Sequence, residues 1–136
     1  LSDAFTDRKL TSLMRGRKTP IKSALLDQRL IAGLGNIYVS EALFRSGISP
    51  RRKAGTIAGQ RAVRLAGAIK TVLNEAISAG GTSLRDHIQP GGEIGYFVQN
   101  LRVYGQAGQP CVDCGQAIKQ IIQSGRSSFY CSSCQR

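Results

Sequence analysis

Apolar residues recur at the three-to-four-residue spacing of amphipathic helices through most of residues 5–80. Thr6 is a candidate N-cap for a first helix, which Gly16 closes. Thr19 and Pro20 begin a second helix, with Thr19 as the cap and Pro20 in the first turn. The pattern therefore predicts that the chain opens with two helices joined by a basic linker.

Two further helices follow these. Residues 33–36 break the second helix and open a third, which ends at Gly47. A second basic linker covers residues 49–53, and Thr56 then caps a long helix over about residues 57–79. Residues 5–80 are thus predicted to form four helices joined by linkers.

The pattern changes after residue 80. Residues 84–88 predict a short helix, whereas residues 89–95 hold three glycines and one proline and cannot form regular structure. Residues 118–123 and 127–130 predict two short strands joined at residues 124–125. The predicted fold class is therefore mainly α with a small β module: a helical domain of residues 1–105, then a β-hairpin module of residues 106–136.

The four cysteines form two C-x2-C pairs separated by 16 residues: Cys111, Cys114, Cys131 and Cys134. This spacing is typical of a four-cysteine zinc site, in which a hairpin brings the second pair opposite the first. Two disulfides or a redox pair are the alternatives. Because four thiolates leave no coordination position for water, the predicted cofactor is one structural Zn²⁺ per chain.

The charge of the chain favours a polyanionic partner. Lys and Arg number 19 against 8 Asp and Glu, which gives a net charge of +11 and a sequence pI of about 10.2. Residues 1–53 alone carry 11 basic and 4 acidic side chains. Nucleic acid is the expected partner, because neutralised phosphates release counterions. A solvated basic surface or a ribosomal role are the alternatives, and no apolar run of membrane-spanning length is present.

Two elements are candidate phosphate-binding sites. Gly33, Gly35 and Asn36 lie at a predicted helix start, where backbone N–H groups and the helix dipole favour an anion. Arg126 lies at the tip of the predicted hairpin, where a guanidinium can be directed at a phosphate. The alternative for residues 33–36 is an ordinary turn between helices. The alternative for Arg126 is an exposed turn arginine without a ligand. Since no catalytic triad or paired carboxylates are evident, these residues indicate a binding module rather than a self-sufficient enzyme.

A series of ordered motifs resembles one family over essentially the whole chain. The motifs are Thr-Pro-Ile-Lys22, Gly-Leu-Gly-Asn-Ile-Tyr-Val-Ser-Glu-Ala-Leu43, Gly-Gly-Thr82, Leu-Arg-Asp86, Gly-Tyr-Phe97, Val-Tyr-Gly105, Pro-Cys111, Cys114-Gly, Arg126-Ser-Ser-Phe-Tyr-Cys131 and Cys134-Gln. In this order they resemble the C-terminal half of bacterial formamidopyrimidine-DNA glycosylases. One departure is Gln106, where the family usually carries arginine.

The resemblance implies a helix–two-turn–helix domain followed by a zinc-finger β-hairpin. It further implies that the full enzyme, a glycosylase and AP lyase, removes 8-oxoguanine and formamidopyrimidines from double-stranded DNA and cuts the strand by β,δ-elimination. The family's nucleophile is an N-terminal proline amine in a preceding domain. We therefore expect this chain to be part of a longer protein, and residues 1–136 alone to bind DNA, including abasic sites, without excising bases.

The resemblance also implies roles for individual residues. Lys22, Asn36, Tyr96 and Arg126 match residues that bind phosphates around the flipped nucleotide, and Arg17 or Lys18 matches a further DNA contact. Arg126 additionally matches a proton donor in δ-elimination. The loop expected to close over the damaged base comprises Gln89, Pro90, Gly91, Gly92, Glu93, Ile94 and Gly95.

An RNA-binding, ribosomal-type helix–two-turn–helix protein with a zinc ribbon is the competing hypothesis. The zinc module and residues 89–95 favour the DNA glycosylase hypothesis. Under that hypothesis we expect a monomer in the bacterial cytoplasm, associated with the nucleoid when it is bound to DNA and not with a membrane.

Overall fold

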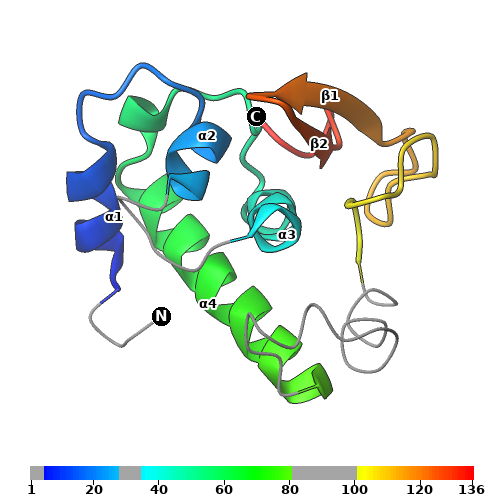
Figure 1. The fold of residues 1–136 in the computed structure, drawn as a ribbon, viewed down its shortest axis with the longest axis horizontal. Helices are drawn as coiled ribbons and strands as arrows, with labels where there is room; N and C mark the ends of the chain where they lie inside the picture. Colours follow the sequence, from blue (N-terminus) through cyan, green and yellow to red (C-terminus); the bar gives the residue numbers. More distant parts are fainter. Residues whose placement is uncertain (1–4, 28–34, 81–100) are drawn as a thin grey trace.

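The computed structural model describes residues 5–27, 35–80 and 101–136 (Figure 1). These residues form helices around a central helix, together with one two-stranded antiparallel hairpin, so the predicted fold class is confirmed. In chain order the elements are α1 (Asp7–Met14), α2 (Ile21–Leu26), α3 (Asn36–Ser46), the 3-10 helix η1 (Ala54–Thr56), α4 (Gln60–Gly80), β1 (Lys119–Gln123) and β2 (Arg126–Tyr130).

The first two helices differ in how they begin. Thr6 caps α1 as predicted, since its side chain accepts a hydrogen bond from the Lys9 backbone N–H at 3.2 Å. The predicted Thr19 cap of α2 is wrong, because Pro20 is the N-cap and makes no side-chain capping bond. The Thr19 carbonyl instead accepts a hydrogen bond from Ala54, and Pro20 pairs with Lys53. Because Thr19 and Pro20 pair with residues 53–54, helix α2 begins one residue later than predicted.

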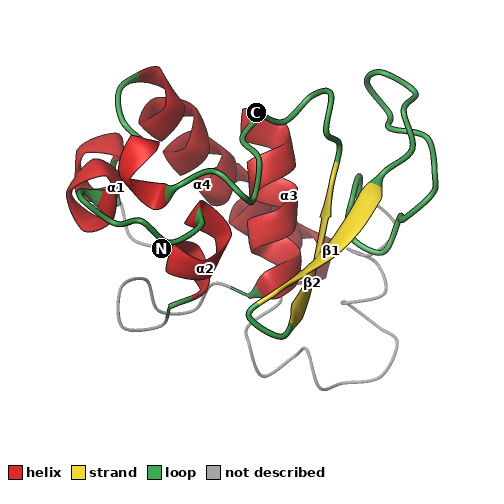
Figure 2. Ribbon diagram, turned by 90° about the horizontal axis from the view of Figure 1, so that it is seen from above, coloured by secondary structure: helices red, strands yellow, loops and turns green. Residues whose placement is uncertain are grey.

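Helix α3 lies at the centre of the fold and is buried on nearly all sides (Figure 2). It packs against α2, α4 and β2, so its apolar positions are not confined to one face. It ends at Gly47 as predicted: Gly47 has φ of +72°, and its N–H donates to the carbonyls of Leu43 and Phe44. Helix α3 therefore connects the other helices to the hairpin.

Helix α4 begins at Gln60, three residues later than predicted. Thr56 does not cap it but belongs to η1, where the Thr56 hydroxyl donates to the Lys53 carbonyl at 2.7 Å. Gly59, with φ of +57°, separates the two helices. Thr56 has the side chain of a helix N-cap, but it lies within the 3-10 helix η1 and therefore cannot cap α4.

The hairpin matches its prediction closely. Strands β1 and β2 pair from Lys119 opposite Tyr130 to Gln123 opposite Arg126. The turn lies at Ser124 and Gly125, both with positive φ, as the right-handed twist of a two-residue hairpin favours. Arg126 is therefore the first residue of β2, immediately after the turn, and its side chain is exposed.

Two apolar clusters stabilise the described chain. The larger one joins all four α-helices and includes Leu10, Leu25, Leu43, Leu65 and Ile69. The smaller one joins Phe44 of α3 to Val103, Cys111, Ile118, Phe129 and Cys131. Because α3 contributes to both clusters, the hairpin module packs directly on the helical part.

Two predictions lie beyond what the structure describes, namely the short helix of residues 84–88 and the irregular segment of residues 89–95. Within residues 5–27, 35–80 and 101–136, none of the helices has the length and apolar character needed to cross a membrane.

Gly55 provides a test of the close packing between η1 and the segment after α1. A Cβ atom at Gly55 would lie 2.9 Å from the Arg17 carbonyl oxygen, and this backbone cannot move aside easily. We expect Gly55→Ala to lower the free energy of unfolding by about 1–3 kcal/mol, the usual range for overpacking. The measurement is urea denaturation followed by circular dichroism.

Gly67→Ala is the matched control. Gly67 lies within α4, and an added Cβ would meet nothing within 4 Å. This variant is expected to raise the free energy of unfolding by about 0.5–1 kcal/mol, because alanine is the better helix former. Equal stability of the two variants would contradict the close contact at Gly55.

Candidate zinc centre and nucleic-acid interface

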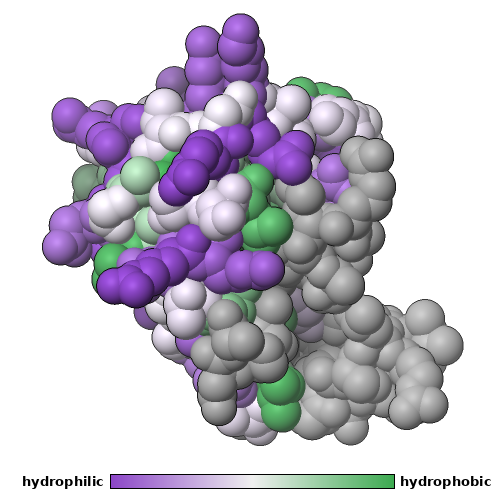
Figure 3. Space-filling model, turned by 90° about the vertical axis from the view of Figure 1, so that its left-hand side faces the viewer, coloured by the Kyte–Doolittle hydropathy of each residue, from purple (hydrophilic) through white to green (hydrophobic). Residues whose placement is uncertain are grey.

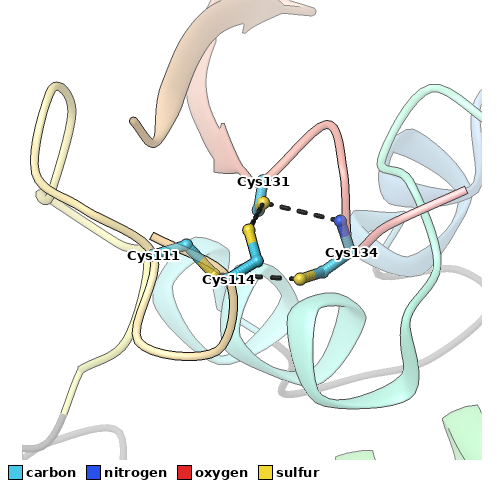
Figure 4. A group of neighbouring side chains, drawn as sticks. All are labelled: Cys111, Cys114, Cys131 and Cys134. Carbon is cyan, nitrogen blue, oxygen red and sulfur yellow. Dashed lines mark hydrogen bonds between the residues drawn. The ribbon is translucent and has the colours of Figure 1, made fainter. Parts of the chain in front are cut away.

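The four cysteines converge on one point (Figure 4). Their Sγ atoms all lie within 4.8 Å of one another, with Cys111 to Cys134 at 3.9 Å and Cys114 to Cys131 at 3.5 Å. Zn–S bonds of about 2.3 Å in a tetrahedron require Sγ atoms about 3.8 Å apart. The arrangement fits one zinc ion, and the cysteines are free thiols rather than disulfides.

The thiols differ in how readily they ionise. A hydrogen bond from the Gln116 backbone lowers the pKa of Cys114 to about 7, with the neighbouring thiols adding to the effect. Burial and the neighbouring sulfurs raise the pKa of Cys134 to about 12. Four adjacent thiolates therefore require a cation, and the divalent zinc ion of a closed four-cysteine site supplies it.

The end of the chain fastens the zinc finger to the helical part. The buried Gln135 side chain accepts from the Cys131 N–H at 2.8 Å and donates to the Ile48 carbonyl at 2.9 Å. The Arg136 N–H donates to the Gly47 carbonyl at 3.0 Å. These bonds hold the second cysteine pair against the C-terminal end of α3.

Near the N-terminal end of α3, the start of β2 is hydrogen-bonded to the helices. Lys22 of α2 donates from Nζ to the Ser127 carbonyl at 2.8 Å and to the Ser128 hydroxyl at 2.5 Å. Asn36, the first residue of α3, donates from Nδ2 to the same Ser127 carbonyl at 3.0 Å. The structure thus brings Lys22 and Asn36 together beside Arg126, although 90 residues separate Asn36 from Arg126.

The electrostatics of this group are unfavourable in the absence of an anion. Only 1% of the Lys22 surface is exposed. Burial, and secondarily the charge of Arg126, lower the pKa of Lys22 to about 8. The Asn36 Oδ1 atom is buried without a hydrogen-bond partner in the described part of the chain. Two cations are therefore held close together where a negative group would stabilise both.

The remaining predicted DNA-contact residues take different positions. Arg17 and Lys18 are exposed in the segment between α1 and α2, and Arg17 Nε donates to the Leu13 carbonyl at 2.8 Å. Gly35 is the N-cap of α3, and a Cβ there would make only ordinary contact with Tyr38 at 3.8 Å. Gly33, Tyr96 and the loop of residues 89–95 lie outside the described residues.

Sequence reasoning missed the role of Glu41. Its carboxylate is fully buried in α3 and accepts three backbone N–H bonds of 2.8–2.9 Å, from Arg102, Val103 and Tyr104. It therefore fixes the chain where the described structure resumes at residue 101. The only clue in the sequence was a charged residue at an inward position of a helix, which does not identify its partners.

Two family models match the chain. The model described as the formamidopyrimidine-DNA glycosylase H2TH domain matches residues 1–87. The model described as the zinc finger found in FPG and IleRS matches residues 108–136. The second match agrees with the clustering of the four cysteines, and the chain carries one structural zinc site.

Individual relatives agree with the family models. A formamidopyrimidine-DNA glycosylase of Paracoccus denitrificans is 56% identical over 138 residues, which cover 100% of this chain and 49% of the relative. The crystal structure of MutM (Fpg) from Thermus thermophilus superimposes with a TM-score of 0.85 at 40% identity, covering 99% of this chain and 52% of that one. A Lactococcus lactis Fpg in complex with DNA containing an abasic site gives 0.83 at 33% identity, covering 97% and 48%.

The chain thus spans about half the length of the relatives that it matches. The matches agree with the DNA glycosylase hypothesis and give no support to the RNA-binding alternative. On the first family model, which alone covers more than half of the chain, and on the relatives above, this chain belongs to the formamidopyrimidine-DNA glycosylase family.

Proposed function

We propose that residues 1–136 form the damaged-DNA-binding half of a base-excision repair glycosylase and AP lyase. The observation that carries the proposal is that Lys22 and Asn36 both donate to the Ser127 carbonyl, directly after Arg126, whose charge acts on Lys22. Solved relatives are described in complex with DNA containing an abasic site, Fapy-dG or carbocyclic 8-oxo-G. Duplex DNA that contains oxidised purines or abasic sites is accordingly the proposed partner.

Each of the three residues supplies a different kind of contact. Arg126 is exposed and can direct a guanidinium fork at phosphate oxygens. Lys22 supplies a largely buried charge, and Asn36 supplies a neutral amide at the start of a helix, where the dipole favours anions. None of these contacts requires a base edge, so the group positions the duplex rather than reading its sequence.

The chemistry of excision is proposed for the whole protein and not for residues 1–136 by themselves. The family resemblance assigns the nucleophile to an N-terminal proline amine in a preceding domain. The proton-donor role of Arg126 in δ-elimination is part of the proposal and rests on the family resemblance. The phosphate contact needs only its charge.

Three further proposals rest on the family resemblance. We refer to Lys22, Asn36 and Arg126 as the central group. We propose that Arg17 or Lys18 contacts DNA beside the central group and that Tyr96 binds a further phosphate. Residues 89–95 are proposed to cover the damaged base. The protein is proposed to act as a monomer on chromosomal DNA in the bacterial cytoplasm.

The zinc site should control DNA binding because it holds the hairpin that carries Arg126. Cys114→Ala is expected to abolish stoichiometric zinc and to unfold residues 111–136, since metal binding of about 10–16 kcal/mol stabilises such small modules. The helices α1 to α4 should remain folded. Elemental analysis measures the metal, and hydrogen exchange locates the loss of protection.

Val112→Ala is the control for this variant, because 66% of the Val112 surface is exposed and its side chain cannot bind metal. It should retain one zinc per chain and bind DNA like the parent. Full zinc content and unchanged protection in Cys114→Ala would show that the cysteine cluster is not the structural site.

The central phosphate contact can be tested by salt titration. Arg126→Ala should weaken binding to all duplex sequences about equally, and should reduce the slope of log affinity against log salt by about one. Asn36→Ala should weaken binding with the slope nearly unchanged, because Asn36 carries no charge. Fluorescence anisotropy with labelled duplexes at several salt concentrations measures both quantities.

Arg8→Ala removes an equal charge from the exposed surface of α1 and serves as the control. It should leave the slope within error of the parent value. If Arg126→Ala bound like the parent at every salt concentration, Arg126 would be an ordinary turn residue and the proposed function would lose its main support.

We expect Lys22 to make the DNA affinity depend on pH. In the free protein its pKa is lowered to about 8, and a bound phosphate would raise the pKa by favouring the charged form. The affinity should therefore be constant below pH 8 and should fall above it, by up to about tenfold per pH unit until the pKa of the complex is reached.

The comparison is made with Lys22→Gln, which keeps an N–H donor for the Ser127 carbonyl but cannot titrate. This variant should bind more weakly at pH 7 and lose the decline above pH 8, as measured by anisotropy at constant ionic strength. A decline of the same size in Lys22→Gln would mean that another group is responsible.

A further inference from the structure

Two basic segments that are separate in the sequence lie side by side in the structure. One precedes α2 and holds Arg17 and Lys18, while the other precedes η1 and holds residues 51–53. Backbone hydrogen bonds join them, from Gly55 to the Arg17 carbonyl at 2.9 Å and from Ile21 to the Arg52 carbonyl at 2.6 Å. The close approach at Gly55 leaves no space for a side chain, so the backbones of the two basic segments lie in direct contact.

An open cleft of about 540 Å³ lies between the second segment and the end of the zinc finger. Its cationic lining residues are Arg51, Arg52, Lys53 and Arg136, and no aspartate or glutamate side chain lines it among the described residues. Ser49 and Tyr130 also line the cleft. A cleft with this lining suits an anion that accepts several hydrogen bonds.

One of these cations is already held in place. Arg52 Nε donates to the Arg136 carbonyl at 2.9 Å, and Arg52 Nη1 donates to the Thr56 hydroxyl at 3.3 Å. Arg51 and Lys53 are exposed, and no hydrogen bond of either side chain occurs within the described part of the chain. Arg52 thus fixes the wall of the cleft, while Arg51 and Lys53 remain available to a ligand.

The cleft adjoins the central group of Lys22, Asn36 and Arg126. Lys53 pairs with Pro20, two residues before Lys22. On the hairpin side, Gln123 pairs with Arg126 and donates from Nε2 to the Pro50 carbonyl at 3.2 Å. In Figure 1 the segment before α2, the segment before η1 and the hairpin turn all lie along the upper edge of the molecule.

Hydrophilic side chains also gather over the upper part of the neighbouring face, seen from the α1 side in Figure 3. A single small anion would explain the charge of the cleft, but it would not explain its continuity with the central group.

We propose that the cleft lined by Arg51, Arg52, Lys53 and Arg136 binds one further phosphodiester of the same duplex, outside the phosphates held by the central group. This inference rests on the proposed function, because it assumes that the central group binds DNA. The cleft extends the contact along the backbone, adding affinity without base specificity.

The test combines a double variant with scanning of the DNA backbone. Arg51→Gln/Lys53→Gln removes the two exposed cations, and Arg8→Gln/Lys9→Gln removes two exposed cations from the first turn of α1 as the charge-matched control. Each protein is titrated by fluorescence anisotropy with duplexes in which one phosphate at a time is replaced by a neutral methylphosphonate. Thermal melting confirms that both variants are folded.

For unmodified DNA, the Arg51→Gln/Lys53→Gln variant should show a salt slope smaller by about one, as expected for one lost phosphate. One methylphosphonate position should weaken the parent and the control while leaving this variant unaffected. That position should differ from any position at which Arg126→Ala becomes insensitive to the replacement.

The possible failures are distinguishable. If the parent binds DNA through Arg126 but the double variant has the parent's slope and responds to every methylphosphonate, the cleft proposal alone is wrong. If the sensitive position coincides with that of Arg126, there is no second phosphate site, and the proposal is again wrong. If the parent does not bind duplex DNA at all, the proposed function fails and the cleft proposal fails with it.

Discussion

The Ser127 carbonyl is the acceptor on which the arrangement of the candidate interface depends. It receives hydrogen bonds from Lys22 of α2 and Asn36 of α3, so one backbone oxygen joins two helices to the hairpin. An isolated charge as buried as Lys22 would be costly, and these bonds, with that to Ser128, partly offset the cost. Arg126 precedes this carbonyl, so its backbone position is set by the same contact.

Helix α3 extends this constraint to the rest of the described chain. At its start Asn36 binds the hairpin turn, in its middle Glu41 accepts three backbone N–H bonds, and at its end the Gly47 carbonyl accepts from Arg136. Arg45 also forms two hydrogen bonds with Glu75 of α4, at 2.6 and 2.9 Å. The zinc finger therefore shares a core and a polar network with the helices and does not merely follow them in the sequence.

Local patterns predicted those features that local interactions determine. The Thr6 cap, the Gly47 helix end, the turn at residues 124–125 and the cysteine spacing each depend on a few adjacent residues, and all four were found as predicted. The helix starts assigned to Thr19 and Thr56 were wrong, because Thr19 pairs with a distant segment and Thr56 lies in a 3-10 turn. Likewise, the basic segments before α2 and η1 were each visible as charge, but their joining into one surface depends on backbone pairing that no local pattern shows. The resemblance named the central group, yet nothing in the neighbourhood of each member indicates that its lysine is buried or that its asparagine shares the same acceptor.

The pairing of these segments places like charges close together on one part of the surface. Folding buries Lys22, which lowers its pKa, and the charge of Arg126 lowers that pKa further. Folding also lines the neighbouring cleft with four cations and no acidic side chain among the described residues. Like charges held at such distances destabilise the folded protein, because each disfavours the charged form of the other. An anion that bridges them removes the repulsion and adds its own attraction. The covalent structure of DNA supplies successive anions along one line. A surface with cations in a row therefore gains more binding free energy from a polyanion than from separate ions, because each separate ion loses its own translational entropy on binding. The contacts that fix the fold thereby also favour a continuous backbone as the ligand.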